Sequence, residues 1–272
     1  MRGLWNTVLK GGIIGATMIV PGVSGGTMAI ILGIYDRLIS AVSSFHKNVK
    51  ENVLFLIVFC LSAVAGLLLF SGPISWLLRK YEIPTLYFFI GAVMGGIPVI
   101  EKKSGIHKIT VSIFFKLLLG VALVVVISKV PNDILIANVV TGNEQWIRIF
   151  MSGIVSAIAL ILPGISFSHF LLILGLYEPL LVALQSINLI FLLPLALGVF
   201  LGIVLFSKLL ETLMKKYPET VYLLILGFII GSVAMIFPGI PLEIDLIFSI
   251  MVAVAGFTLT YYSARKNIYK QL

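Results

Sequence analysis

Long apolar runs separated by short basic links are the feature that most constrains the fold. One run, Val53–Leu78, contains no charged residue and is long enough to cross a lipid bilayer with some tilt. The whole chain is 60% hydrophobic and only 11% charged, whereas an average soluble domain has about 25% charged residues. Because so few charges cannot cover a water-facing surface, the sequence predicts an integral membrane protein.

Six apolar runs are predicted to cross the membrane as helices, so the expected fold class is an all-α polytopic membrane protein. The predicted spans are residues 53–78, 83–100, 109–128, 189–207, 220–237 and 244–263. The net charge of +8 comes largely from lysines and arginines in the short links, where such residues set topology and contact anionic headgroups. We therefore expect membrane lipids as partners, and no nucleic acid.

Two further apolar segments, 12–35 and 149–177, are interrupted by helix-breaking residues. Their centres are Val20–Thr27 (VPGVSGGT) and Leu162–His169 (LPGISFSH), and proline and glycine disfavour an uninterrupted helix. Non-helical backbone is tolerated at membrane depth only where it is buried in protein or lines a cavity. The predicted hinge residues are Pro21, Gly22, Pro163 and Gly164.

The two halves of the chain are related by duplication. Pro21 aligns with Pro163 at an offset of 142 residues (163 − 21), and Asp36 then aligns with Glu178. Further identities at this offset pair Gly22, Ser24, Leu32, Gly33, Tyr35 and Leu38 with Gly164, Ser166, Leu174, Gly175, Tyr177 and Leu180. At an offset of 136 residues, Gly66–Ser71 matches Gly202–Ser207, and Tyr81, Gly91 and Gly95 match Tyr217, Gly227 and Gly231. So many identities in register are not expected by chance.

Each half contains one broken segment and three plain spans, and the course of the broken segment decides the topology. If it turns back as a re-entrant helical hairpin, each half crosses three times and the second half is inverted, as in many transporters. If it crosses, each half has four spans and the halves are parallel. With Lys116 left out as intramembrane, the re-entrant topology places fourteen lysines and arginines inside and four outside, against twelve and six for the crossing topology. The positive-inside rule therefore favours two inverted-topology repeats.

The predicted organisation has four parts. They are a first repeat at 1–130, an extracellular linker at 131–147, a second repeat at 148–263 and a cytoplasmic tail at 264–272. Both termini are then cytoplasmic. Half-helices of about nine residues on either side of each break would just reach the midplane of a hydrocarbon core about 30 Å thick.

The first break is a candidate anion site. A helix that begins at Ser24–Thr27 presents unpaired backbone N–H groups and the positive end of its dipole, and its hydroxyl groups add donors. The residues expected to bind a phosphate are Ser24, Gly25, Gly26 and Thr27, with Ser166, Ser168 and His169 as a second cluster. In inverted repeats the two helix starts would meet at one shared site. The alternative is that both breaks only kink the helices and allow close packing.

Charged residues near the broken segments each have two interpretations. Arg37 and Arg148 are either counter-charges for a phosphate or topology signals. Asp36 and Glu178 either carry protons or cap helices and pair with a nearby arginine. His169 is the only histidine inside an apolar stretch, where it is either a proton carrier or a hydrogen-bonding group.

Motifs of several enzyme classes are absent. The sequence contains no G-x-x-x-x-G-K-[ST] phosphate loop, no H-E-x-x-H and no paired cysteines. The histidines at 46, 107 and 169 are scattered, which argues against a metal site. The single cysteine, Cys60, lies in an apolar run and is interpreted as a packing residue. We expect no catalytic residue, no metal and no cofactor.

The two breaks and the residues that follow them resemble one family. Val20–Thr27 followed by Ile31–Asp36 (ILGIYD), with Leu162–Ser166 and Leu174–Glu178 (LGLYE), is similar to the PopT-type polyprenyl-phosphate (undecaprenyl phosphate) transporters. The resemblance covers nearly the whole chain. It implies a bacterial plasma-membrane protein that returns undecaprenyl phosphate, the lipid carrier of cell-wall precursors, from the outer to the cytoplasmic leaflet.

The chain departs from that family at two positions. Phe167 replaces the second glycine of the family's usual Pro-Gly-Ile-Ser-Gly-Ser motif, and Met18 stands where many members carry an aspartate. We therefore expect the first break to be the main phosphate cradle and the second to be a modified partner.

The resulting expectation is a lipid-carrier translocase, or flippase, and not an enzyme. A channel or secondary carrier for a small anion or solute is the alternative, because re-entrant segments also build selectivity filters. A lipid-phosphate phosphatase ranks third, since no nucleophile with an acid–base pair is found. The energy source is left open, as is the oligomeric state, a homodimer included.

Overall fold

The computed structural model describes residues 2–20, 22–105, 110–130, 145–241 and 244–269. Within these ranges the chain forms α-helices and one short 3-10 helix, η1 (Phe45–Lys47), and no β-strand. The prediction of an all-helical protein is therefore confirmed.

A long helix corresponds to each of the six predicted spans. These helices are α4 (Val49–Lys80), α5 (Glu82–Ser104), α6 (Val111–Lys129), α10 (Leu189–Lys216), α11 (Pro218–Ile236) and α12 (Ile244–Tyr269). All six are long and apolar enough to cross a membrane. The largest difference from prediction is at α10, which continues nine residues past the predicted end at 207 because Leu, Lys, Glu and Met all favour a helix after the apolar run stops.

Each broken segment, together with the residues that flank it, forms three shorter helices instead of two. The first segment gives α1 (Arg2–Thr17), α2 (Gly25–Ile31) and α3 (Tyr35–Ser43), and the second gives α7 (Gln145–Ile161), α8 (Phe167–Ile173) and α9 (Tyr177–Gln185). The predicted breaks are present, but the prediction of nine-residue half-helices was wrong, since α1 has 16 residues and α2 and α8 have seven each.

A second break in each segment was missed by the sequence reasoning. It falls between α2 and α3, where the helix axes meet at 114°, and again between α8 and α9. Gly33 and Gly175 occupy these turns with φ of 66° and 65°, a left-handed conformation that glycine adopts without strain. The Leu-Gly-x-Tyr pattern, which occurs in both halves, could have predicted this second break.

Helix packing repeats at the same sequence offsets as the identities. The helix α1 packs on α4 as α7 packs on α10, and α5 packs on α12 as α11 packs on α6. A Cβ added to Gly66 would lie 2.0 Å from the carbonyl oxygen of Gly12, and one added to Gly202 would lie 2.5 Å from the carbonyl oxygen of Ile154, so neither position has room for a side chain. Both pairs are related by the two offsets (154 − 12 = 142 and 202 − 66 = 136). The two halves therefore use the same contacts.

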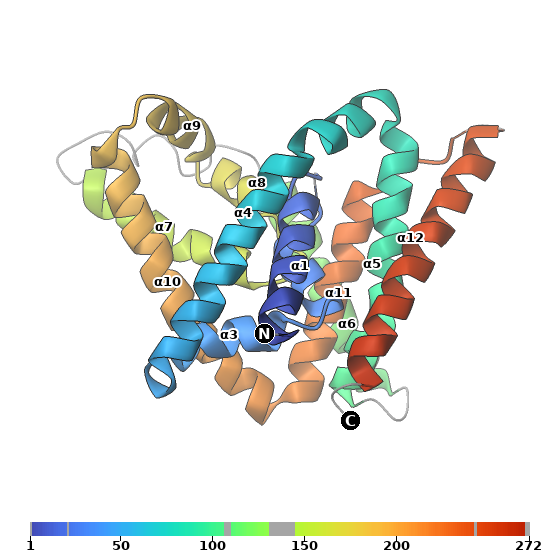
Figure 1. Ribbon diagram of the computed structural model, residues 1–272, viewed down its shortest axis with the longest axis horizontal. Coiled ribbons are helices and arrows are strands. Elements are labelled where there is room, and N and C mark those ends of the chain that lie inside the picture. The colour runs from blue at the N-terminus through green and yellow to red at the C-terminus, as the bar shows by residue number, and fades with distance from the viewer. Residues whose placement is uncertain (1, 21, 106–109, 131–144, 242–243, 270–272) are drawn as a thin grey trace.

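Corresponding helices run in opposite directions in Figure 1. The helix α4 runs from the lower end to the upper end and its counterpart α10 from the upper end to the lower end. The helix α3 lies at the lower end and α9 at the upper end. The helices α5 and α11 are the most buried of the long helices, while α4, α6, α10 and α12 lie at the periphery with many exposed apolar side chains. Such an apolar periphery suits a lipid environment.

Candidate functional site

The two proline-glycine breaks contact each other at the centre of the molecule. The backbone N–H of Gly164 donates a hydrogen bond to Oγ1 of Thr27 at 3.0 Å, and both groups are buried. The hydroxyl of Tyr35 donates to the carbonyl of Ile161 at 2.7 Å. A Cβ on Gly26 would lie 3.3 Å from Cα of Pro163, so the absence of a side chain at Gly26 lets the two backbones approach.

A cavity of about 330 Å³ lies beside this contact. Ser24, Gly25 and Gly26 line it from the first break, and Ser166 and Phe167 line it from the second. Apolar side chains of α1, α4, α7 and α10 form its walls, and α3 contributes Tyr35, Leu38, Ile39 and Val42. The cavity therefore combines an apolar wall with two polar helix starts.

The two helix starts differ in how their N–H groups are satisfied. Ser24 has the extended backbone of an N-cap residue, yet its side chain makes no capping hydrogen bond to α2. Its counterpart Ser166 accepts a hydrogen bond from the N–H of His169 at 3.5 Å. Phe167 takes the position of Gly25 (167 − 142 = 25) and lines the same cavity. Ser24 thus leaves the first-turn N–H groups of α2 without a side-chain cap, whereas Ser166 caps α8.

Comparison with known proteins identifies the family. Residues 14–245 match the model of a family described as undecaprenyl phosphate translocase-like. The chain belongs to the undecaprenyl phosphate translocase-like family. It is 31% identical over 268 residues to a polyprenyl-phosphate transporter of Staphylococcus aureus, covering 93% of each chain. It is 30% identical over 247 residues to a polyprenyl-phosphate transporter of Vibrio cholerae, covering 86% of this chain and 77% of the other. No solved structure gives a significant match.

In this member of the undecaprenyl phosphate translocase-like family, only part of the predicted site lines the central cavity. Ser24, Gly25, Gly26 and Ser166 do so. Thr27 is 1% exposed, does not line the cavity, and its Oγ1 accepts the hydrogen bond from Gly164. Of the remaining predicted residues, Pro21 and the side chain of Ser168 lie outside the described residues.

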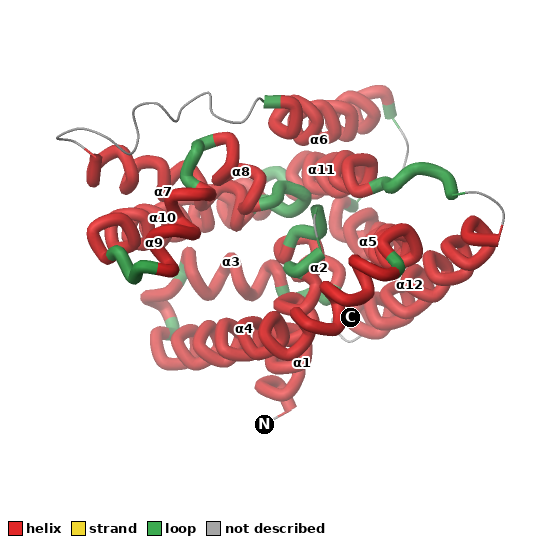
Figure 2. Tube along the Cα trace, turned by 90° about the horizontal axis from the view of Figure 1, so that it is seen from above, coloured by secondary structure: helices red, strands yellow, loops and turns green. Residues whose placement is uncertain are grey.

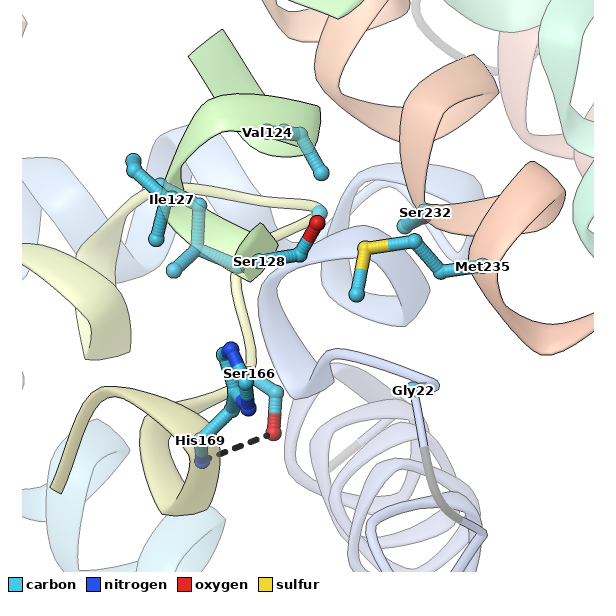
Figure 3. Close-up of a pocket in the computed structure, with 10 residues that line it drawn as sticks. Gly22, Val124, Ile127, Ser128, Ser166, His169, Ser232 and Met235 are labelled. Carbon is cyan, nitrogen blue, oxygen red and sulfur yellow. Dashed lines mark hydrogen bonds between the residues drawn. The ribbon is translucent and has the colours of Figure 1, made fainter. Parts of the chain in front are cut away.

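His169 faces a second and smaller cavity of about 40 Å³. Ser128, Ser232 and Met235 line this space together with His169, as Figure 3 shows. The Nε2 atom of His169 is buried and has no hydrogen-bond partner among the described residues. The backbone of Gly22, a predicted hinge residue, lies on the opposite wall. His169 therefore lines a small, mostly apolar space that also contains serines, and not the central cavity.

Neither predicted counter-charge lines the central cavity. Arg37 donates to Oδ1 of Asn52 at 2.8 Å, pairs with Glu51 at 3.2 Å and lies over the ring of Phe55. These contacts hold its guanidinium against the start of α4. Arg148 is exposed in the first turn of α7.

The two acidic residues of the repeated motif have different surroundings. Asp36 pairs with Lys103 and accepts a hydrogen bond from the hydroxyl of Tyr222 at 2.9 Å. Its counterpart Glu178 is exposed. The repeats have therefore diverged in the contacts of this position, although both retain an acid.

Ser207, Tyr35 and Met18 line the central cavity and were not predicted as site residues. Ser207 is 1% exposed and lies on α10. The repeated pattern that ends in Ser71 and Ser207 was a signal for it, but the pattern alone does not show which of the two serines faces a cavity. Met18 lies next to Gly25, which places the position that departs from the family beside the first helix start.

Proposed function

We propose that this protein moves a polyprenyl phosphate, specifically undecaprenyl phosphate, from the outer to the cytoplasmic leaflet of a bacterial plasma membrane for reuse in cell-envelope synthesis. The family match and the names of the two relatives support the substrate class. The proposed direction agrees with the role of a lipid carrier that must return to the cytoplasmic side.

The observation that carries the proposal is the central cavity shared by both breaks. We assign the phosphate to Ser24, Gly25 and Gly26, with Ser166 opposite, because these residues line one cavity from two sides. None of the described residues that line it is a lysine or arginine. The phosphate would therefore be held by N–H and O–H donors, and since α2 has only seven residues, these hydrogen bonds count for more than a helix dipole.

Other predicted site residues take supporting roles in this proposal. Thr27 joins the two breaks through Gly164. Arg37 and Arg148 attract the phosphate at the two membrane surfaces instead of within the cavity. His169 is the strongest candidate for proton coupling, because its Nε2 is buried beside three serines; Asp36 and Glu178 are the other candidates.

We further propose that the halves are inverted repeats with re-entrant broken segments. The opposite directions of α4 and α10, the placement of α3 and α9 at opposite ends, and the packing contacts repeated at fixed offsets support this. The end of the molecule that holds α3 would be cytoplasmic, because most of the basic residues lie in links at that end.

An enzymatic alternative has one formal motif to consider. The sequence of Gly22–Gly26 (GVSGG) matches the G-x-S-x-G pattern of the nucleophile elbow. In that elbow, however, the serine lies between a strand and a helix. The described residues contain no strand, and the cavity that Ser24 lines contains no histidine. These observations favour transport over hydrolysis.

The test is transfer of labelled undecaprenyl phosphate between leaflets in proteoliposomes, with and without a proton gradient. Ser24→Ala should weaken headgroup binding about 10- to 100-fold, because a hydrogen bond to a charged group contributes roughly 1.5–3 kcal/mol. Ser207→Ala should also reduce transfer. The matched control is Ser71→Ala, because Ser71 occupies the equivalent position on α4 and bonds to its own helix at Leu68.

Three results would contradict the proposal. They are transfer that is unchanged by Ser24→Ala, release of free alcohol from the lipid by pure protein, and uptake of inorganic phosphate without lipid transfer. The second would favour a phosphatase, and the third a small-anion carrier.

A further inference from the structure

The helix α3 belongs to the first half of the chain and is held in place by contacts with the second half. At its first residue, the hydroxyl of Tyr35 bonds to the carbonyl of Ile161 at the end of α7. At its last residue, Ser43 donates to the carboxylate of Glu211 on α10, and Ser44 donates to the same oxygen at 3.3 Å. With its ends fixed in this way, α3 forms one wall of the central cavity.

The equivalent contacts of α9 are not made. At the offset of 142 residues the counterpart of the first bond would join the hydroxyl of Tyr177 to the carbonyl of Ile19 (161 − 142 = 19). No such bond joins them in the part of the chain that the structure describes. The helix α9 packs on α10 of its own half and contributes no residue to the cavity. Seen from above in Figure 2, no helix is drawn over α3.

The carbonyl of Ile161 explains why a tyrosine is needed at position 35. Ile161 is the last residue of α7, where carbonyl groups have no partner within the helix. A buried carbonyl requires a hydrogen-bond donor, and Tyr35, which is 3% exposed, supplies the hydroxyl from the opposite half. Ile19 lies just beyond the end of α1, in the equivalent break. In the described part of the chain no backbone N–H bonds to its carbonyl, so that carbonyl can accept from the same residue type on α9.

We propose that Tyr35 and Tyr177 are paired positioning residues that decide which end of the cavity is closed. In the observed state Tyr35 holds α3 against α7. In the exchanged state the hydroxyl of Tyr177 bonds to the carbonyl of Ile19, α9 closes over the cavity from its own end, and α3 is released. The inference rests on the proposed transport function, because alternate opening gives a lipid headgroup access to each leaflet in turn.

The two closed states are not equivalent. Asp36 adds contacts to Lys103 and Tyr222 in the observed state. At the repeat offsets, Glu178 would instead meet Gly239 (103 + 136) and Leu86 (222 − 136), neither of which has a side chain able to pair with an acid. The state closed by α3 therefore has the larger set of polar contacts and is the favoured state without substrate.

Two double-cysteine pairs distinguish the states in a Cys60→Ala background. The pair Ser43→Cys with Glu211→Cys reports the observed state, because these side chains are in direct contact. The repeat-related pair is Gln185→Cys with Ser75→Cys (43 + 142 = 185 and 211 − 136 = 75), which should approach only in the exchanged state. Disulfide formation by a mild oxidant in proteoliposomes is measured for each pair.

The two tyrosine variants are expected to change the cross-linking rates of the two cysteine pairs in opposite directions. Tyr35→Phe should slow cross-linking of the first pair and speed that of the second severalfold, and Tyr177→Phe should do the reverse. A purely structural role would instead lower thermal stability in both variants without opposite shifts. Unchanged rates, or shifts in the same direction, would overturn the proposal. Since cross-linking needs no substrate, loss of lipid transfer alone would contradict the proposed function and not this exchange.

Discussion

The hydrogen bond between Thr27 and Gly164 shows how a single hydroxyl joins two segments that lie 137 residues apart. Thr27 was predicted as a phosphate ligand on the basis of its place at a helix start. In the structure its oxygen accepts a hydrogen bond from a buried N–H in the other break. A hydroxyl at a break can therefore serve assembly of the site as well as ligand binding.

Replacing Thr27 tests this role. Thr27→Val keeps the shape of the side chain but leaves the N–H of Gly164 without its acceptor, so it should destabilise the fold by about 1–3 kcal/mol. Thr27→Ser keeps the accepting oxygen and should therefore destabilise the fold less than Thr27→Val. Chemical or thermal unfolding in detergent measures both. Equal stability of the valine and serine variants would show that the bond is unimportant.

Gly164 allows a second test at this scale. Its φ is +83°, and an added Cβ would lie 2.6 Å from the backbone of Phe228. Gly164→Ala should therefore cost more than about 2 kcal/mol, because positive φ and a backbone clash act together. Gly239 has a φ of +87° but no atom within 4 Å of the added Cβ, so Gly239→Ala isolates the conformational cost. Equal losses in the melting temperature of the two variants would contradict the clash.

At the scale of the elements, glycine contacts between helices explain how the two halves interlock. Gly227 on α11 faces Gly120 on α6, and a Cβ added to Gly227 would lie 2.5 Å from the carbonyl of Leu117. Its counterpart Gly91 on α5 faces the backbone of Ala253 on α12. Without a hydrophobic driving force between helices in lipid, such close backbone approach is what holds helix pairs together.

Gly227→Ala should therefore separate α6 from α11 and destabilise the protein by about 1–3 kcal/mol. Gly72→Ala is the matched helical control, because nothing lies within 4 Å of its added Cβ; it should be neutral or stabilise by about 0.5–1 kcal/mol. Thermal unfolding in detergent or nanodiscs measures both. A melting temperature for Gly227→Ala at or above that of Gly72→Ala would contradict this packing argument.

At the scale of the whole molecule, the arrangement of basic residues predicts its orientation in the membrane. The start of α4 and the end of α10 lie at one end, and the end of α4 lies at the other. In a Cys60→Ala background, Lys50→Cys and Lys216→Cys should be labelled only from the cytoplasmic side, and Lys80→Cys only from outside. A membrane-impermeant maleimide applied to intact cells measures this. Labelling of positions 50 and 80 from the same side would contradict the topology.

Much of the architecture was predictable because hydropathy and helix breaking are local properties. The six spans follow from uninterrupted apolar runs, and the two main breaks follow from Pro21 and Pro163 with their neighbouring glycines. The duplication follows from identities at fixed offsets. The family resemblance, carried by the two breaks and the tyrosine that follows each, was confirmed by the comparisons.

Only the tertiary structure decided what individual polar residues contact, because those partners are distant in sequence. Arg37 is held by Asn52 instead of facing the cavity, and Ser207 faces the cavity while its repeat partner Ser71 bonds to its own helix. Tyr35 bonds to the carbonyl of Ile161, whereas Tyr177 makes no bond to the carbonyl of Ile19. This difference also depends on how the helices pack and cannot be read from the repeated motif. Identical motifs in two repeats have one local preference, but the helices packed around each copy differ, so packing decides which copy makes the contact.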